Sequence, residues 1–156
     1  MKKAVILDEI SIDRKIKRLS YEIFERNLNN KKILFVGIKK NGFVLAKLIK
    51  KELSKICKIK IDITQVLVDK KKPFAEYVIY NNSIETHRNT SVIVIDDVCS
   101  SGKTMMYVVS SLIYNLTNKI STLVLVDRKH HNFPIKTDYV GIEVSTTPVS
   151  YTHLTL

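Results

Sequence analysis

Two adjacent carboxylates, Asp96 and Asp97, follow the apolar run 92–95 and come just before a turn of small, hydroxyl-bearing residues. Two negative charges side by side at the edge of a core are costly unless a ligand outside the core uses them. Carboxylates accept hydrogen bonds from hydroxyl groups and coordinate divalent cations. The pair therefore predicts a site for two neighbouring hydroxyls or for a metal ion, although a single aspartate here would more simply cap a helix or a turn.

The turn that follows has the composition of a phosphate-binding site. A helical pattern begins directly after the turn, which consists of Ser100, Ser101, Gly102, Lys103 and Thr104. The free backbone N–H groups and the dipole at a helix start attract an anion, and the hydroxyls and the lysine add donors and charge. A phosphate here, with the carboxylates upstream, matches a 5-phosphorylated ribose, which carries its phosphate at one end and two neighbouring hydroxyls in the middle.

Two common nucleotide-binding motifs are excluded by the positions of the glycines. A triphosphate P-loop ending at Gly102 would need a glycine where the chain has Asp97. The pair Gly37 and Gly42 has the P-loop spacing, but Phe43 and Val44 follow it instead of Lys and Ser or Thr. The chain has only 4 glycines, and they cannot be arranged as the GxGxxG of dinucleotide sites.

Strand and helix patterns alternate along the chain. Apolar periodicity predicts helices over 11–27, about 43–53 and 105–116, and strands over 32–38, 58–64, 91–96, 121–127 and 138–144. Several strands are continuously apolar, which is typical of a parallel sheet covered by helices on both faces. Ligands bind such sheets at the carboxyl ends of the strands, where the carboxylate pair lies. Residues 69–90 predict a long mobile loop, with a hairpin inside it as one alternative.

Composition is that of a globular protein with one domain. The 156 residues are 45% hydrophobic and 26% charged, and no apolar run approaches the roughly 20 residues that span a bilayer. Asp8 and Glu9 interrupt the short apolar start, so no secretory signal peptide is predicted. The net charge of +11 is compatible with nucleic acid or phosphorylated partners, although a solvated, lysine-rich surface is the simpler explanation.

The cysteines and histidines suggest neither a metal site nor a disulfide. Cys57 and Cys99 have no CxxC spacing, so reduced thiols in a cytoplasmic protein are predicted. Cys99 is expected to be a small side chain in a tight turn, with no base near it in the sequence. His130 and His131 are expected to be surface or packing residues rather than catalytic bases.

Residues 92–104 resemble the phosphoribosyl-pyrophosphate (PRPP) signature of the type I phosphoribosyltransferases. The blocks 7–27, 36–49 and 124–141 are similar, in order, to the PyrR-like branch of this family, which combines uracil phosphoribosyl transfer with control of pyrimidine genes. The resemblance runs from about 7 to 147, except for the middle loop. It implies a single α/β domain over 1–147 with the Rossmann-like fold of the family. A mainly parallel central sheet is expected between helices, with a flexible loop over about 69–90 and a small hood built from the N-terminal segment and about 128–147. The tail 148–156 matches nothing in the family and is expected to be non-native.

The resemblance also implies a reaction and its site. PRPP and a nucleobase, uracil favoured, would give a nucleoside monophosphate and pyrophosphate with Mg²⁺ present. Asp96 and Asp97 would be catalytic, holding the ribose hydroxyls and placing the metal indirectly, while the turn 100–104 would hold the 5-phosphate. The expected pyrophosphate loop is Lys39, Lys40 and Asn41, and Arg128 matches a position near the bound nucleotide.

A second function from another class stays open: a nucleotide-sensing, RNA-binding regulator of pyrimidine genes with weak or no catalysis. The sequence has no dedicated RNA-reading motif, but basic residues crowd two predicted helices. They are Arg14, Lys15, Lys17 and Arg18 in the first and Lys47, Lys50, Lys51 and Lys55 in the second. The family resemblance also implies a homo-oligomer, a dimer or larger.

Overall fold

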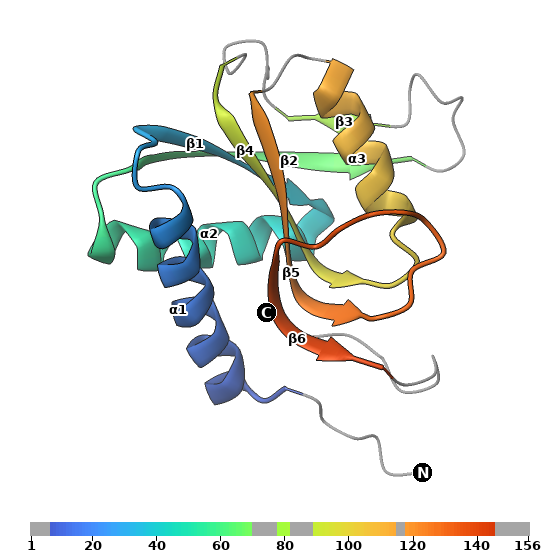
Figure 1. Ribbon diagram of the computed structural model, residues 1–156, viewed down its shortest axis with the longest axis horizontal. Helices are drawn as coiled ribbons and strands as arrows, with labels where there is room; N and C mark the ends of the chain where they lie inside the picture. The colour runs from blue at the N-terminus through green and yellow to red at the C-terminus, as the bar shows by residue number, and fades with distance from the viewer. Residues whose placement is uncertain (1–6, 70–77, 82–88, 115–117, 146–156) are drawn as a thin grey trace.

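The computed structural model describes residues 7–69, 78–81, 89–114 and 118–145 (Figure 1). The elements in chain order are α1 (Glu9–Arg26), β1 (Lys32–Ile38), α2 (Lys39–Ile56), β2 (Lys60–Val68), β3 (Val78–Tyr80), β4 (Ser91–Cys99), α3 (Lys103–Tyr114), β5 (Lys119–Arg128) and β6 (Tyr139–Val144). The described strands form one sheet in the order β3-β2-β1-β4-β5-β6. Every pair is parallel except β2 with β3, which confirms the mainly parallel sheet.

Helices cover both faces of the sheet. Successive side chains of a strand point to opposite faces, and β1 shows this alternation clearly. Ile33 and Phe35 pack with α1 and α2, whereas Leu34 and Val36 pack with α3. Figure 1 shows α3 on the side of the sheet away from α1 and α2. Within the described ranges, no helix is long and apolar enough to cross a membrane.

Several strand ends differ from the sequence-based expectation. The strand expected over 91–96 continues to Cys99, because β5 runs on beside it and pairs Val98 with Val126. The strand expected over 58–64 occupies Lys60–Val68. In the expected loop 69–90, Val78–Tyr80 forms strand β3, which pairs antiparallel with β2, a strand that ends before the loop, so a hairpin inside the loop stays a prediction. Residues 70–77 and 82–88 of that loop and the tail 148–156 lie outside the described residues.

Helix α1 is fixed at its start by a cap and along its length by the last strand. The Asp8 side chain accepts a hydrogen bond from the backbone N–H of Ser11 at 2.7 Å, the usual N-cap arrangement. The Arg18 guanidinium donates to the carbonyls of Val140 at 3.0 Å and Gly141 at 2.6 Å. Since these residues belong to β6, Arg18 joins the two ends of the described chain.

Replacing Arg18 with alanine is expected to lower the free energy of unfolding by about 1 kcal/mol, the usual net worth of such hydrogen bonds. Urea denaturation measures this as a lower midpoint. Arg14→Ala is the matched control, because Arg14 is exposed on the same helix and such surface changes stay within about 0.5 kcal/mol. Equal midpoints for the two variants would contradict the role of Arg18.

Candidate active site

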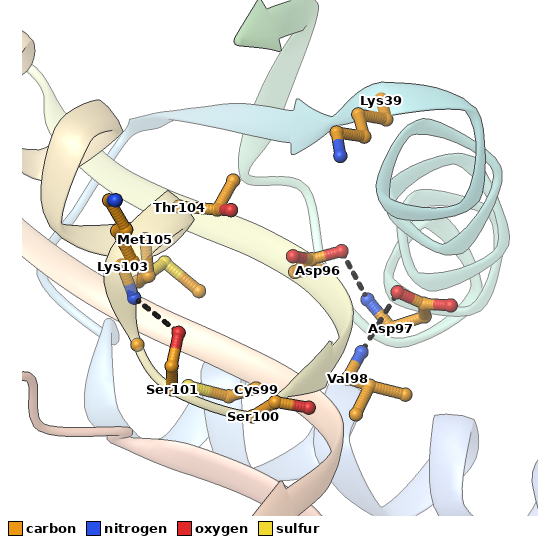
Figure 2. A pocket seen from close by; sticks show the side chains of 11 residues that line it. Lys39, Asp96, Asp97, Val98, Cys99, Ser100, Ser101, Lys103, Thr104 and Met105 are labelled. Carbon is orange, nitrogen blue, oxygen red and sulfur yellow. Dashed lines mark hydrogen bonds between the residues drawn. The ribbon is translucent and has the colours of Figure 1, made fainter. Parts of the chain in front are cut away.

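An open pocket of about 280 Å³ lies at the carboxyl ends of β1 and β4. Figure 2 shows the residues that line it, which come from the β1–α2 junction, the end of β4, the turn after it and the start of α3. The lining consists of Lys39, Asp96, Asp97, Val98, Cys99, Ser100, Ser101, Gly102, Lys103, Thr104 and Met105. The carboxylate pair and the whole hydroxyl-rich turn therefore meet in one pocket, as the sequence predicts, together with one lysine from a distant part of the chain.

The two carboxylates have different surroundings. Asp97 accepts hydrogen bonds from the Asn41 side-chain amide and from the backbone N–H of Val98, both at 2.9 Å. Asp96 accepts one from the backbone N–H of Asp97 at 2.8 Å. In Figure 2 the Asp97 carboxylate lies on the side of α2, whereas the Asp96 carboxylate lies toward Thr104 and Lys39. Asp97 is thus held by two hydrogen bonds from the protein, whereas Asp96 accepts one and keeps more capacity to accept hydrogen bonds from a ligand.

Burial raises the pKa of Asp96 well above its ordinary value. The neighbouring Asp97 carboxyl adds to the rise, while the backbone N–H of Asp97 and the charge of Lys39 oppose it. A negative charge at Asp96 is therefore costly unless a ligand offsets it. Hydroxyl donors or a nearby cation from a ligand would offset that cost, so this carboxylate is suited to bind rather than to stabilise the fold.

The turn 100–104 is held in shape by Gly102 and by the segment that follows β5. Gly102 has φ +85, and a Cβ there would lie 2.5 Å from the Ile135 Cγ2 atom. The carbonyl of Ser101 accepts a hydrogen bond from the Phe133 N–H at 3.0 Å, and the Gly102 carbonyl accepts the first helical bond from Met106 at 2.9 Å. Because α3 begins at Lys103, its first N–H groups lie at the pocket, where they can bind an anion.

The junction between β1 and α2 is unusually tight. Lys39 has φ 53, a left-handed conformation that is uncommon outside glycine and costs about 1 to 3 kcal/mol. Three residues on, a Cβ at Gly42 would lie only 2.4 Å from the Ile95 carbonyl oxygen. Glycine at this position lets α2 lie directly against β4, one residue before Asp96. The close approach brings Lys39 to the pocket wall.

Not every expected site residue lines the pocket. Lys40 is exposed and lies outside the lining, and Asn41 acts on the site through its bond to Asp97. Arg128 ends β5 at the same edge of the sheet, paired with Val144, but it is also outside the lining. The turn 100–104 and the carboxylate pair are therefore the compact part of the expected site.

One cluster is missed by the sequence expectation. Cys99, Asp127 and His131 each offer an atom within 4.8 Å of the others. The sequence offers no base near Cys99, but the fold does, because pairing of β4 with β5 places Cys99 beside Asp127, and the next segment returns His131 to the same place. In the sequence, only the four-residue spacing of Asp127 and His131 could have indicated the cluster.

Comparison with known proteins matches this architecture to one family. The family model described as "Phosphoribosyl transferase domain" matches residues 5–154. The chain belongs to the phosphoribosyltransferase family. It is 34% identical to the bifunctional protein PyrR of Actinobacillus succinogenes, over 92% of the chain and 86% of that protein. It is also 34% identical to the bifunctional protein PyrR of Streptococcus gordonii, over 94% and 87%. The chain is thus a PyrR-like type I phosphoribosyltransferase.

Solved phosphoribosyltransferase structures share the fold. A hypoxanthine-guanine phosphoribosyltransferase from Bacillus anthracis has a TM-score of 0.76 at 19% identity, covering 91% of this chain and 82% of that one. A hypoxanthine phosphoribosyl transferase from Trypanosoma cruzi has a TM-score of 0.78 at 14% identity, covering 92% and 79%. These matches confirm the predicted Rossmann-like phosphoribosyltransferase fold.

Proposed function

We propose that this phosphoribosyltransferase binds PRPP in the pocket and transfers its phosphoribosyl group to a nucleobase, with uracil as the favoured base. The products would be the nucleoside monophosphate and pyrophosphate. The observation that carries the proposal is the meeting of a carboxylate pair, a phosphate-binding turn and Lys39 around one open pocket. The preference for uracil rests on the similarity to the PyrR-like branch, which the sequence blocks support.

In the proposed reaction a ring nitrogen of the base bonds to ribose C1 as the bond from C1 to pyrophosphate breaks, and the proton of that nitrogen is released. Asp96 and Asp97 would hold the two ribose hydroxyls, and the turn 100–104 would hold the 5-phosphate. Lys39 would stabilise the charge that grows on the departing pyrophosphate. Little covalent chemistry is asked of the protein, because positioning and charge stabilisation lower the barrier.

The donor set of the pocket also fits Mg²⁺, the cofactor that the family uses with PRPP. The carboxylate oxygens of Asp96 and Asp97 are the hard ligands that this ion prefers, and Mg²⁺ is usually held by one or two carboxylates together with phosphate oxygens. When bound, the ion would neutralise charge on the pyrophosphate. We propose that the two aspartates hold it through the ribose hydroxyls and water.

Release of pyrophosphate from PRPP tests the proposal, with uracil, hypoxanthine and guanine offered separately in the presence of Mg²⁺. Release with uracil supports the full proposal. Release with a purine alone would keep phosphoribosyl transfer and overturn the uracil preference. No release with any base, alongside intact binding of UMP, would overturn the enzyme and favour the regulator described below.

Lys39 and Lys40 offer a matched pair of adjacent lysines. Lys39→Ala is expected to lower kcat/KM for PRPP about tenfold or more, because one charge-assisted contact is worth about 1.5 to 3 kcal/mol. Lys40→Ala is expected to change it less than threefold, since Lys40 lies outside the pocket lining. Steady-state kinetics with PRPP varied measures both. Equal losses would show that the pyrophosphate contacts the whole junction.

The second candidate is a nucleotide-sensing RNA-binding regulator. Its support is the exposure of four lysines on α2, together with the net charge of +11. These lysines are Lys47, Lys50, Lys51 and Lys55. RNA binding by such a face depends steeply on salt, with a slope near −0.7 for each phosphate contact on a single strand. Replacing Lys47, Lys50 and Lys51 with alanine should therefore reduce the slope by roughly two, and an unchanged slope would exclude α2 as the RNA face.

Three further expectations stay predictions. They are a homo-oligomer, a cytoplasmic location and a single phosphoribosyltransferase domain over 1–147 with its hood and loop. Sedimentation analysis of the purified chain, with and without UMP, checks the first of these directly.

A further inference from the structure

A polar cluster lies behind the phosphate turn, outside the proposed PRPP contacts. Cys99 ends β4 and is buried, Asp127 is the second-last residue of β5, and His131 follows in the next segment. The side chains of His131 and Asp127 are only 13% and 8% exposed. The ligand atoms of all three, one sulfur, one nitrogen and one carboxylate oxygen, lie within 4.8 Å of one another. Three different metal-binding groups therefore converge in a nearly enclosed place.

The outer contacts of the cluster are those that orient metal ligands. The His131 Nδ1 atom lies 3.2 Å from the Ile135 carbonyl oxygen, which can only accept, so Nδ1 carries a proton. The other nitrogen, Nε2, faces the Asp127 Oδ1 atom at 2.5 Å. The second oxygen of Asp127 accepts from the Thr137 hydroxyl at 2.6 Å. A ligating histidine usually donates its other N–H to a carbonyl or carboxylate, and a ligating carboxylate is usually hydrogen-bonded in turn.

We propose that Cys99, Asp127 and His131 form a binding site for one transition-metal ion of the zinc class. Ligands at about 2.0 to 2.3 Å from a tetrahedral zinc ion lie roughly 3.5 Å apart, so small side-chain shifts suffice to seat the ion. Two protons leave to solvent as the ion binds, the thiol proton of Cys99 and the proton shared between His131 Nε2 and Asp127 Oδ1. Thiolate, carboxylate and neutral imidazole then together balance the charge of a divalent cation. Three protein ligands leave one position for water. A sulfur and an imidazole nitrogen favour zinc over Mg²⁺, which prefers oxygen.

The cluster is a poor candidate for a cysteine nucleophile. Burial, with help from the charges of Asp127 and Asp96, raises the pKa of the Cys99 thiol to about 12. The thiolate is the reactive form, so the metal-free cysteine is inert near neutral pH. None of the three proposed ligands is assigned to PRPP or to the base, but Cys99 also lines the pocket proposed for PRPP.

Cobalt and zinc binding to the full chain tests the site. We expect one Co²⁺ per chain, with a thiolate-to-cobalt charge-transfer band in the near ultraviolet that Zn²⁺ abolishes by displacement. Cys99→Ser should remove the band and weaken Zn²⁺ binding at least tenfold. Cys57→Ser is the matched control, since Cys57 is the other cysteine and lies outside the cluster. Absence of the band in the wild type, or its loss in Cys57→Ser alone, would overturn the proposal.

Histidine variants provide a second, independent pair. His131→Gln should weaken Zn²⁺ binding at least tenfold, whereas His130→Gln, at the exposed neighbour, should leave it within twofold of the wild type. Thr137→Val keeps all three ligands and removes the hydrogen bond to Asp127, so roughly tenfold weaker binding is expected. If Cys99→Ser does not fold, His131→Gln decides: unchanged Zn²⁺ affinity there, with native circular dichroism, overturns the site.

Discussion

Replacing Asp96 with asparagine is expected to reduce PRPP-dependent turnover at least about hundredfold. Asp96 accepts fewer hydrogen bonds from the protein than Asp97, which is bound by Asn41 and Val98, so it has more capacity to accept hydrogen bonds from a ligand. A hydrogen bond to a charged group is worth about 1.5 to 3 kcal/mol, and the proposal assigns the aspartates two ribose hydroxyls and an indirect metal contact. Steady-state rates of pyrophosphate release measure the loss, and retention of most of the activity would remove Asp96 from the mechanism.

The same variant is expected to be more stable than the wild type at neutral pH. Because the folded state raises the pKa of Asp96, the ionised carboxylate destabilises the fold. The destabilisation by the ionised carboxylate is absent at low pH, grows as the pH rises above the ordinary pKa of 3.8, and is complete above the pKa in the folded state. Asparagine removes the charge, so the gain in Tm should be absent near pH 3 and grow toward pH 7. Asp13→Asn, on the exposed face of α1, controls for the loss of one negative charge.

The second large effect is a loss of stability expected for Gly42→Ala. Helix propensity alone would predict the opposite, a gain in stability. Alanine usually stabilises a helix by about 1 kcal/mol relative to glycine. Here the added Cβ would lie 2.4 Å from the Ile95 carbonyl oxygen, which is backbone in the central strand β4 and has little freedom to move. Overpacking costs about 1 to 3 kcal/mol, so a loss near 3 kcal/mol, or roughly 10 °C in Tm, is expected for Gly42→Ala.

Thermal and urea denaturation measure the effect of Gly42→Ala. Lys50→Ala is the control, because Lys50 is exposed on the same helix and reports the propensity change alone. If Gly42→Ala still folds, weaker PRPP binding should accompany the loss of stability. The clash of the added Cβ with the Ile95 carbonyl lies next to Asp96, and it would displace the start of α2, where Lys39 lies. A variant as stable as the wild type would mean that α2 does not lie directly against β4.

Local patterns carried most of the fold. Continuous apolar strands predicted a parallel sheet covered on both faces, and the helical spacing in 11–27 and 105–116 located α1 and α3. Strand ends were less predictable, because they depend on the neighbouring strand. The β4 strand continues through its two aspartates only because β5 offers partners for Val98 and Cys99.

Some residues of the candidate site could be predicted from local sequence, and others depend on the fold. The carboxylate pair and the turn are contiguous in sequence, so their residue types alone predicted their shared pocket. Lys39 reaches the pocket through a left-handed backbone that no local rule assigns to a lysine, and nothing in the sequence separates it from Lys40. The Cys99 cluster depends on strand pairing and on the return of the segment after β5, so no spacing rule could have found it whole.

The three helices in the described part of the chain begin in different electrostatic conditions. Helix α1 has Asp8 as its cap and Glu9 in its first turn, which suits the positive end of a helix dipole. The first turns of α2 and α3 contain no acidic residue and begin with Lys39 and Lys103 instead. Positive charges therefore gather at two positive helix ends beside the pocket, and the protein without ligand retains that repulsion. An anion bound between the two helix ends would reduce that repulsion and bind their free N–H groups. We therefore expect the Tm of the chain to rise with the concentration of a phosphorylated ligand.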